Sequence, residues 1–201
     1  MSISRRTMLA AGAVAAIPAV LSMPSLALAA DDATALDAQL ATWMLIDGHK
    51  QIWVSKPAAE KATMAEVKAF AEAEMKEHQD LKAKIMAKGV KPVVMVGEDK
   101  EMKMEAGTAA SVLGFKSELA VQCIKTLNAD MAQKSGAEFD HAYVFSQMVA
   151  HMELKDTVTV AMQHASADMK PILTDAMSII ETHLSTLKGL HKNVMSSMMK
   201  M

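Results

Sequence analysis

Residues 169–194 read MKPILTDAMSIIETHLSTLKGLHKNV, and this stretch decides the fold. Apolar residues, with one histidine among them, recur in it at alternating spacings of three and four. They are Leu173, Ala176, Ile180, His183, Leu187, Leu190 and Val194. Side chains at these spacings share one side of an α-helix, a pattern typical of the seam where the helices of a bundle meet. The stretch therefore predicts one long helix of a bundle.

Four further segments carry a helical period, and no segment alternates as a β-strand would. These segments are residues 33–55, 58–88, 108–134 and 137–165. Pro57 is expected to separate the first two, because proline lacks an amide proton and clashes with the preceding turn. Residues 89–105 are irregular and are expected to form a crossover. Short connections make neighbouring helices antiparallel, so the sequence predicts an all-α, up-and-down bundle of four or five helices.

Local signals refine the ends and faces of these helices. Asp168 is expected to cap the last helix, and Pro171 fits its first turn. Residues 195–201, which are rich in methionine, are expected to fray. The third helix is expected to bury Val112, Leu119, Cys123 and Leu127.

The composition excludes several classes of protein. The chain has 201 residues, of which 51% are hydrophobic, enough for one well-filled core. With 8 glycines and 5 prolines, the chain resembles neither a β-sandwich nor a disordered protein. Cys123 is the only cysteine, which excludes an intramolecular disulfide and a cysteine-based zinc site. We therefore expect a single helical domain over residues 31–201.

Residues 1–30 have the pattern of a twin-arginine signal peptide. Two adjacent arginines precede an uncharged, alanine-rich stretch, and Ala27-Leu28-Ala29 supplies the small residues that signal peptidase needs. Cleavage after Ala29 or Ala30 would release the domain into the periplasm. The alternative is a signal that is retained as a membrane anchor, because the apolar stretch is about long enough to cross a bilayer.

Arg5 and Arg6 are the only arginines, so the exported domain carries its positive charge on lysine alone. Cleavage leaves 19 lysines against 23 acidic residues, a formal charge of −4. Without guanidinium groups the domain lacks bidentate contacts to phosphate or guanine. We therefore expect no nucleic-acid partner and, after cleavage, no membrane span. Association into a homo-oligomer stays open.

Polar residues interrupt the apolar seams of four helices. Glu74 and His78 lie one turn apart on the second helix, His151 lies on the fourth, His183 on the fifth and Asp47 on the first. An unpaired carboxylate or imidazole inside a bundle costs on the order of several kcal/mol. Two arrangements satisfy these groups: a closed network of hydrogen bonds, or a metal ion bound between helices. The spacing alone leaves both open.

The neighbours of the inward histidines bear on the kind of metal. A ferritin-type pair of iron ions needs Glu-x-x-His motifs. Here Met75, Met148 and Ile180 stand three residues before the three histidines. Glu77 and Glu181 precede two of the histidines more closely and are expected on other faces of their helices. A two-iron oxidase is therefore disfavoured.

Methionine is abundant, with 20 residues in the chain. Met75 and Met148 offer thioether ligands beside imidazole, a combination that suits Cu(I). Methionine also fills gaps in helical cores, so the same residues fit a purely structural role. Copper and iron are thus the candidate metals, and no residue stands out as catalytic.

Three short motifs are similar to those of a bacterial envelope family. They are Ala59-Glu60-Lys61-Ala62 with Glu66-Val67-Lys68-Ala69-Phe70-Ala71 before His78, Ser135-Gly136-Ala137-Glu138-Phe139-Asp140 with Tyr143 before His151, and Glu181 before His183. Over residues 35–192 the chain resembles this ferritin-like helical-bundle family of unknown function, whose members are often labelled "predicted outer membrane protein". The resemblance implies an exported bundle in which the three histidines belong together. It supplies no reaction.

Three hypotheses follow from these observations. The first is a non-enzymatic periplasmic bundle, acting in envelope stress or metal tolerance, whose inward histidines are structural or hold a metal ion. The second is a copper-handling protein that uses the three inward histidines with Met75 and Met148. The third is a ferritin-like di-metal oxidase that uses Asp47, Glu74 and the same histidines.

Overall fold

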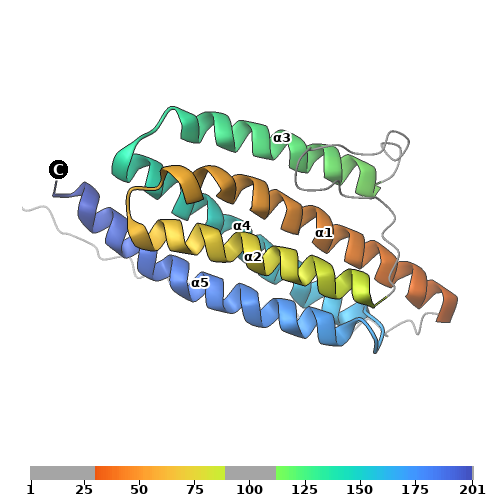
Figure 1. The fold of residues 1–201 in the computed structure, drawn as a ribbon. Helices are drawn as coiled ribbons and strands as arrows, with labels where there is room; N and C mark the ends of the chain where they lie inside the picture. Colours follow the sequence, from red (N-terminus) through yellow and green to blue (C-terminus); the bar gives the residue numbers. More distant parts are fainter. Residues whose placement is uncertain (1–29, 89–111, 201) are drawn as a thin grey trace, which may run out of the picture.

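Five α-helices make up residues 30–88 and 112–200, the part of the chain that a computed structural model describes (Figure 1). Their bounds are Ala30–Lys61 (α1), Ala65–Ala87 (α2), Val112–Ala132 (α3), Gly136–His164 (α4) and Lys170–Met198 (α5). These described residues contain no β-strand, in agreement with the all-α prediction. The predicted crossover at residues 89–105 lies outside the described residues, and so do residues 1–29 of the predicted signal peptide.

The helices alternate in direction along the chain (Figure 1). α1 and α2 form one antiparallel hairpin, α4 and α5 form another, and the two hairpins pack into a four-helix bundle. α3 lies along the outside of α1 rather than beside α2, which precedes it in the chain. The predicted up-and-down bundle is therefore confirmed, with four helices around the core and a fifth attached to one side.

The apolar core consists of two clusters that follow each other along the bundle. On α2 one cluster contains Val67 and Phe70 and the other contains Leu81 and Ile85, and α4 and α5 are divided in the same way. A layer of buried polar residues lies between the clusters: Asp47, Gln51, Glu74, His78, Gln147, His151 and His183. Since buried polar groups need partners, this polar layer is the natural place to look for a functional site.

Helix α1 continues through Pro57 to Lys61, so the predicted break at this proline is wrong. A proline inside a helix leaves the carbonyl four residues earlier, here that of Trp53, without its usual donor. The side chain of Asn128 on α3 donates a hydrogen bond to this carbonyl at 3.4 Å. The packing of α3 on α1 thus satisfies the backbone group that proline leaves unpaired.

The chain turns between α1 and α2 at residues 62–64, because Asp140 of α4 holds the backbone there. The Oδ1 atom of Asp140 accepts from the amide of Thr63 at 2.9 Å, and Oδ2 accepts from the amide of Met64 at 2.8 Å and the Thr63 hydroxyl at 2.7 Å. Asp140 is fully buried. A carboxylate from another helix therefore holds the turn before α2, and α2 begins at Ala65 rather than at residue 58 as predicted.

Ser166, and not Asp168, caps α5. Its hydroxyl accepts hydrogen bonds from the amides of Asp168 at 3.2 Å and Met169 at 3.3 Å, and donates one to Asp37 of α1. Pro171 lies in the first turn, as predicted. At its other end α5 continues to Met198, so the methionines from 195 to 198 are helical rather than frayed.

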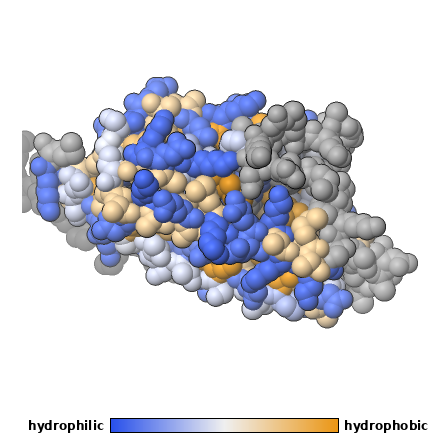
Figure 2. All heavy atoms as spheres, viewed as in Figure 1, coloured by the Kyte–Doolittle hydropathy of each residue, from blue (hydrophilic) through white to orange (hydrophobic). Residues whose placement is uncertain are grey.

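Helix α3 turns a different face to the bundle than the sequence predicted. Val112 and Leu119 are exposed, and Cys123 and Leu127 are half-buried. The residues it buries are Leu113, Gly114, Ser117, Ala120, Ile124 and Met131. Because α3 packs mainly on α1, only a narrow strip of it is covered. On the face drawn in Figure 2, hydrophilic side chains alternate with apolar patches.

Candidate metal centre

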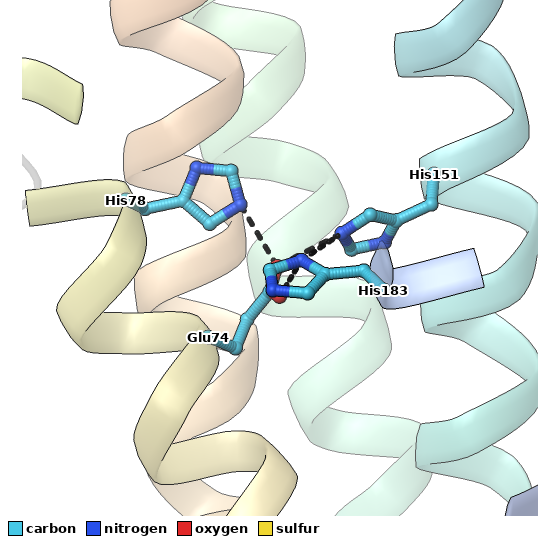
Figure 3. Close-up of side chains that lie close together, drawn as sticks. All are labelled: Glu74, His78, His151 and His183. Carbon is cyan, nitrogen blue, oxygen red and sulfur yellow. Dashed lines mark hydrogen bonds and ion pairs between the residues drawn. The ribbon is translucent and has the colours of Figure 1, made fainter. Parts of the chain in front are cut away.

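Four side chains from three helices meet in the polar layer. Glu74 and His78 come from α2, His151 from α4 and His183 from α5, and the three rings surround the carboxylate (Figure 3). Each residue offers one ligand atom that lies within 4.8 Å of the ligand atoms of the others. All four side chains are buried, Glu74 and His151 completely. The structure therefore brings together in one place four of the seven residues that the sequence indicated.

The Glu74 carboxylate is the centre of the group. Its Oε1 atom lies 2.8 Å from Nε2 of His78 and 3.3 Å from Nε2 of His151, and its Oε2 atom lies 2.7 Å from Nδ1 of His183. Ligand atoms at 2.0–2.1 Å from a tetrahedral metal ion are about 3.3 Å apart from one another. The contacts to Glu74 are at or below this value, whereas the ligand atoms of the whole group are spread over up to 4.8 Å, so the side chains would have to shift to surround an ion.

A hydrogen bond to the backbone fixes the tautomer of His151, and with it the state of the nitrogen that faces Glu74. The Nδ1 atom of His151 lies 2.8 Å from the backbone oxygen of Gln147. A carbonyl oxygen only accepts, so Nδ1 carries the proton that it donates. In the neutral ring, Nε2 then presents a lone pair to the centre of the group.

His183 is arranged in the same way. Its Nε2 atom donates to the Glu77 carboxylate on α2, which leaves the lone pair of the neutral ring on Nδ1. This Nδ1 lies 3.0 Å from Nε2 of His151. Two lone pairs therefore face each other beside a carboxylate, an arrangement that needs a proton or a metal ion to be stable. An acceptor behind each ring is also what orients histidines that bind metals.

The electrostatics of the group agree with this arrangement. Burial alone raises the pKa of Glu74, but the charge of His78 and the hydrogen bonds that the three imidazoles donate when protonated outweigh it, so the pKa lies well below its ordinary value. Burial lowers the pKa of His183, but Glu74 and Glu77 raise it above the ordinary value. The carboxylate therefore stays ionised and attracts a positive charge, either a proton on imidazole or a metal cation.

Close packing fixes the rings in this orientation. Phe70 meets the ring of His183 edge-on, with ring centres 5.4 Å apart. On α1, Gly48 lies against His78, where a Cβ atom would be only 3.3 Å from Nδ1 of that ring. The absence of a side chain at Gly48 thus leaves room for His78 in the polar layer.

The other three predicted ligands have different surroundings. Asp47 is buried, but its carboxylate pairs with Lys116 of α3 at 2.8 Å. Met148 packs against the apolar cluster that contains Phe70, and Met75 is only half-buried, whereas all four grouped residues are buried. For Asp47 and Met148 a nearer partner or an apolar surface therefore takes the side chain.

Glu77 is the residue of the site whose role the sequence reasoning missed. It lies on a different face of α2 from His78, as predicted, but reaches His183 on the neighbouring helix. Its spacing of three from Glu74 was the available signal, since residues three apart are neighbours on a helix surface. Gly48 and the backbone carbonyl of Gln147 carried no signal of this kind.

Comparison with known proteins places the chain in a family. Residues 23–190 match the family described as a domain of unknown function, DUF4142. The chain belongs to this family. Among curated proteins and solved structures nothing matches it. The DUF4142 match confirms the expected family of unknown function, and it carries neither the ferritin-like arrangement nor the outer-membrane label. The Glu74 group lies inside the part of the chain that DUF4142 covers.

Within the described residues, no helix combines the length and apolar character that a membrane span requires.

The chemistry of the donor set limits the ion it could hold. Three imidazole nitrogens and one carboxylate oxygen suit divalent ions such as zinc, copper(II), iron(II) or nickel. Magnesium and calcium prefer oxygen ligands only. A pair of ions needs bridging carboxylates, and the group formed by the described residues contains only that of Glu74. The site is therefore suited to a single transition-metal ion.

Proposed function

We propose that this protein binds one divalent transition-metal ion through Glu74, His78, His151 and His183. The observation that carries the proposal is the facing pair of ring nitrogens of His151 and His183. A purely structural network would place a donor opposite each acceptor. With both rings neutral, two acceptors face each other here. A second proton on His183, whose pKa is raised, removes the conflict, and so does an ion, which would also use the ligand atoms of Glu74 and His78.

The role of the ion follows from its surroundings. The group is buried between four helices, which suits tight retention of a metal more than rapid exchange with substrate in solution. We propose a non-enzymatic role in metal tolerance or envelope stress, in a protein exported to the periplasm by the twin-arginine signal of residues 1–30. Support for export is the pattern of two arginines, an apolar stretch and a small-residue cleavage site. Two antiparallel hairpins with inward ligands also favour a ferritin-like arrangement.

Copper is the ion we favour among the candidates. Sites built from nitrogen and oxygen bind copper(II) more tightly than the other divalent ions of its row. The oxidation state differs from the Cu(I) that Met75 and Met148 suggested, because imidazole and carboxylate ligands suit copper(II). Iron in a two-ion oxidase is less well supported, since Asp47 is held by Lys116.

Metal analysis of the purified full-length protein tests the proposal. The apoprotein is titrated with copper(II), zinc(II) and iron(II), and the bound metal is counted by mass spectrometry. We expect one ion per chain, a rise in melting temperature on binding, and loss of both in His151→Ala and His183→Ala. His164→Ala, in an exposed residue at the end of α4, is the matched control and should bind as the wild type does. Unaltered melting and no bound metal would exclude the proposal.

A further inference from the structure

A small cavity borders the metal-binding group on the side away from its carboxylate. The cavity has a volume of about 30 Å³ and is lined by His78, His151 and His183. Of the four grouped residues, Glu74 alone does not line it. An ion held by the four ligands would therefore have the carboxylate behind it and the cavity in front, across the face formed by the three rings.

The volume sets the size of what fits. On this measure about 10–15 Å³ is enough for one water molecule. The cavity is thus large enough for a molecule of two or three atoms, and too small for an amino acid or a sugar. It is filled by none of the described side chains.

The walls favour an uncharged occupant. Beyond the histidines, most of the lining side chains are apolar, among them Leu81, Leu154 and Ala176. Asp47 also lines the cavity, but its charge is matched by Lys116, whose ammonium lies over the ring of Trp43 at 4.0 Å. The walls therefore carry no unbalanced positive charge for an anion, although the buried indole N–H of Trp43, which has no hydrogen-bond partner among the described residues, offers an occupant one donor.

The charge balance of the centre points the same way. A divalent ion beside the carboxylates of Glu74 and Glu77 gives a group without net charge. An added anion would then be a buried charge without a counterion, which is costly in an apolar surrounding. A neutral molecule avoids this cost.

A larger apolar groove lies next to the cavity. The groove has a volume of about 510 Å³ and runs between α1 and α4. Trp43, Met44, Thr157 and Val158 line both the groove and the cavity. Only one layer of side chains therefore separates the two spaces, and apolar side chains form most of that layer.

We propose that the metal ion keeps one coordination position open towards this cavity, where it binds a neutral molecule of two or three atoms. The inference rests on the proposed function, since it needs the ion in place. It adds the class of ligand, and it makes the cavity a specificity-determining part of the site.

Nitric oxide is a suitable probe, because it is neutral, diatomic and gives iron(II) a characteristic paramagnetic signal. The full-length protein is loaded with iron(II) without oxygen, titrated with nitric oxide and followed by electron paramagnetic resonance. We expect one nitric oxide per ion, and at least tenfold weaker binding of azide, an anion of similar size, measured on the same loaded protein.

Variants that fill the cavity make the test specific. Ala176→Leu and Thr157→Leu place extra carbon atoms in the cavity without changing a ligand, so we expect both to retain iron(II) and to bind nitric oxide at least tenfold more weakly. Using two positions guards against one variant failing to fold. Ala120→Leu, on a buried residue of α3 outside the cavity, is the matched control.

The outcomes separate this inference from the proposed function. Iron(II) that binds while nitric oxide does not, or nitric oxide that binds equally well in both filled variants, overturns the open position and leaves the metal site standing. Azide that binds as well as nitric oxide overturns the preference for neutral ligands. Failure to bind any metal removes the proposed function itself.

Discussion

The Nε2 atom of His151 lies 3.0 Å from the Nδ1 atom of His183. The other nitrogen of each ring donates a hydrogen bond, from His151 to the Gln147 carbonyl and from His183 to the Glu77 carboxylate. In the metal-free protein a proton must occupy the space between the two nitrogens, since two lone pairs at this distance repel each other. A metal ion takes the place of that proton. Metal binding should therefore release protons and become tighter as the pH rises.

The stability of the metal-free protein should decrease at alkaline pH. The pKa of His183 is raised on folding, because Glu74 and Glu77 outweigh the effect of burial. Such a group stabilises the fold fully below its unfolded-state pKa, about 6.5, and loses this contribution as the pH rises through the folded-state value. We expect the free energy of unfolding, from urea titrations, to fall above about pH 6.5, and less steeply in His183→Ala.

The same titration should show a loss of stability in acid. The pKa of Glu74 lies well below its ordinary value, despite the opposing effect of burial. Its contribution is present above the unfolded-state pKa of about 4.3 and disappears as the pH falls through the lower folded-state value. The metal-free protein should be most stable between about pH 4.5 and 6.5. With metal bound, stability should instead continue to rise above pH 6.5, and a parallel fall in both forms would contradict the assignment.

Replacing Glu77 by alanine should weaken metal binding without removing a ligand. The Glu77 carboxylate accepts from Nε2 of His183 and so orients the ring. Loss of a partner behind a ligating histidine typically lowers affinity by about 10–100-fold. Competition against a coloured chelator measures the change, with the stoichiometry staying at one. Glu181→Ala, which removes an exposed carboxylate paired with Lys155, is the control and should keep wild-type affinity.

Asp47 should matter for stability and not for metal binding. Its carboxylate and the Lys116 ammonium form a buried pair at 2.8 Å. Removing one partner of a buried pair leaves the other charge unpaired and costs about 3–5 kcal/mol. Asp47→Ala should therefore unfold at lower urea concentration, and a double variant with Lys116→Met should recover part of the loss. If Asp47→Ala folds normally but loses its metal, Asp47 is a ligand after all.

Asp140 should be one of the most sensitive polar residues outside the metal centre. It accepts three hydrogen bonds from the turn at Thr63 and Met64, and hydrogen bonds to a charged group contribute about 1.5–3 kcal/mol. We expect Asp140→Ala to lower the free energy of unfolding by about 3 kcal/mol, measured by chemical denaturation. Asp140→Asn keeps one acceptor oxygen and should lose less. Glu138→Ala, in an exposed residue of the same helix, should stay within about 0.5 kcal/mol of the wild type.

Much of the fold could be predicted because residues three or four apart lie on the same face of a helix, so the apolar residues show which face is buried. The stripe of α5 from Leu173 to Val194 is buried as its spacing required. Errors arose where a partner from elsewhere in the chain decided the outcome. Asn128 lets α1 pass through Pro57, and Asp140 moves the turn to residues 62–64. Helix α3 has only one main neighbour, so its apolar pattern did not define which face is covered.

The amino-acid sequence by itself determined that Glu74, His78, His151 and His183 point into the bundle, because helical geometry fixes the side on which each residue lies. It also determined that helices joined by a short connection, such as α1 with α2 and α4 with α5, run antiparallel. Only the tertiary structure decided that the four side chains share one level of the bundle, and that Asp47 turns to Lys116 instead. The level at which side chains on different helices meet depends on how far the helices slide past one another, and the packing of both apolar clusters sets that distance.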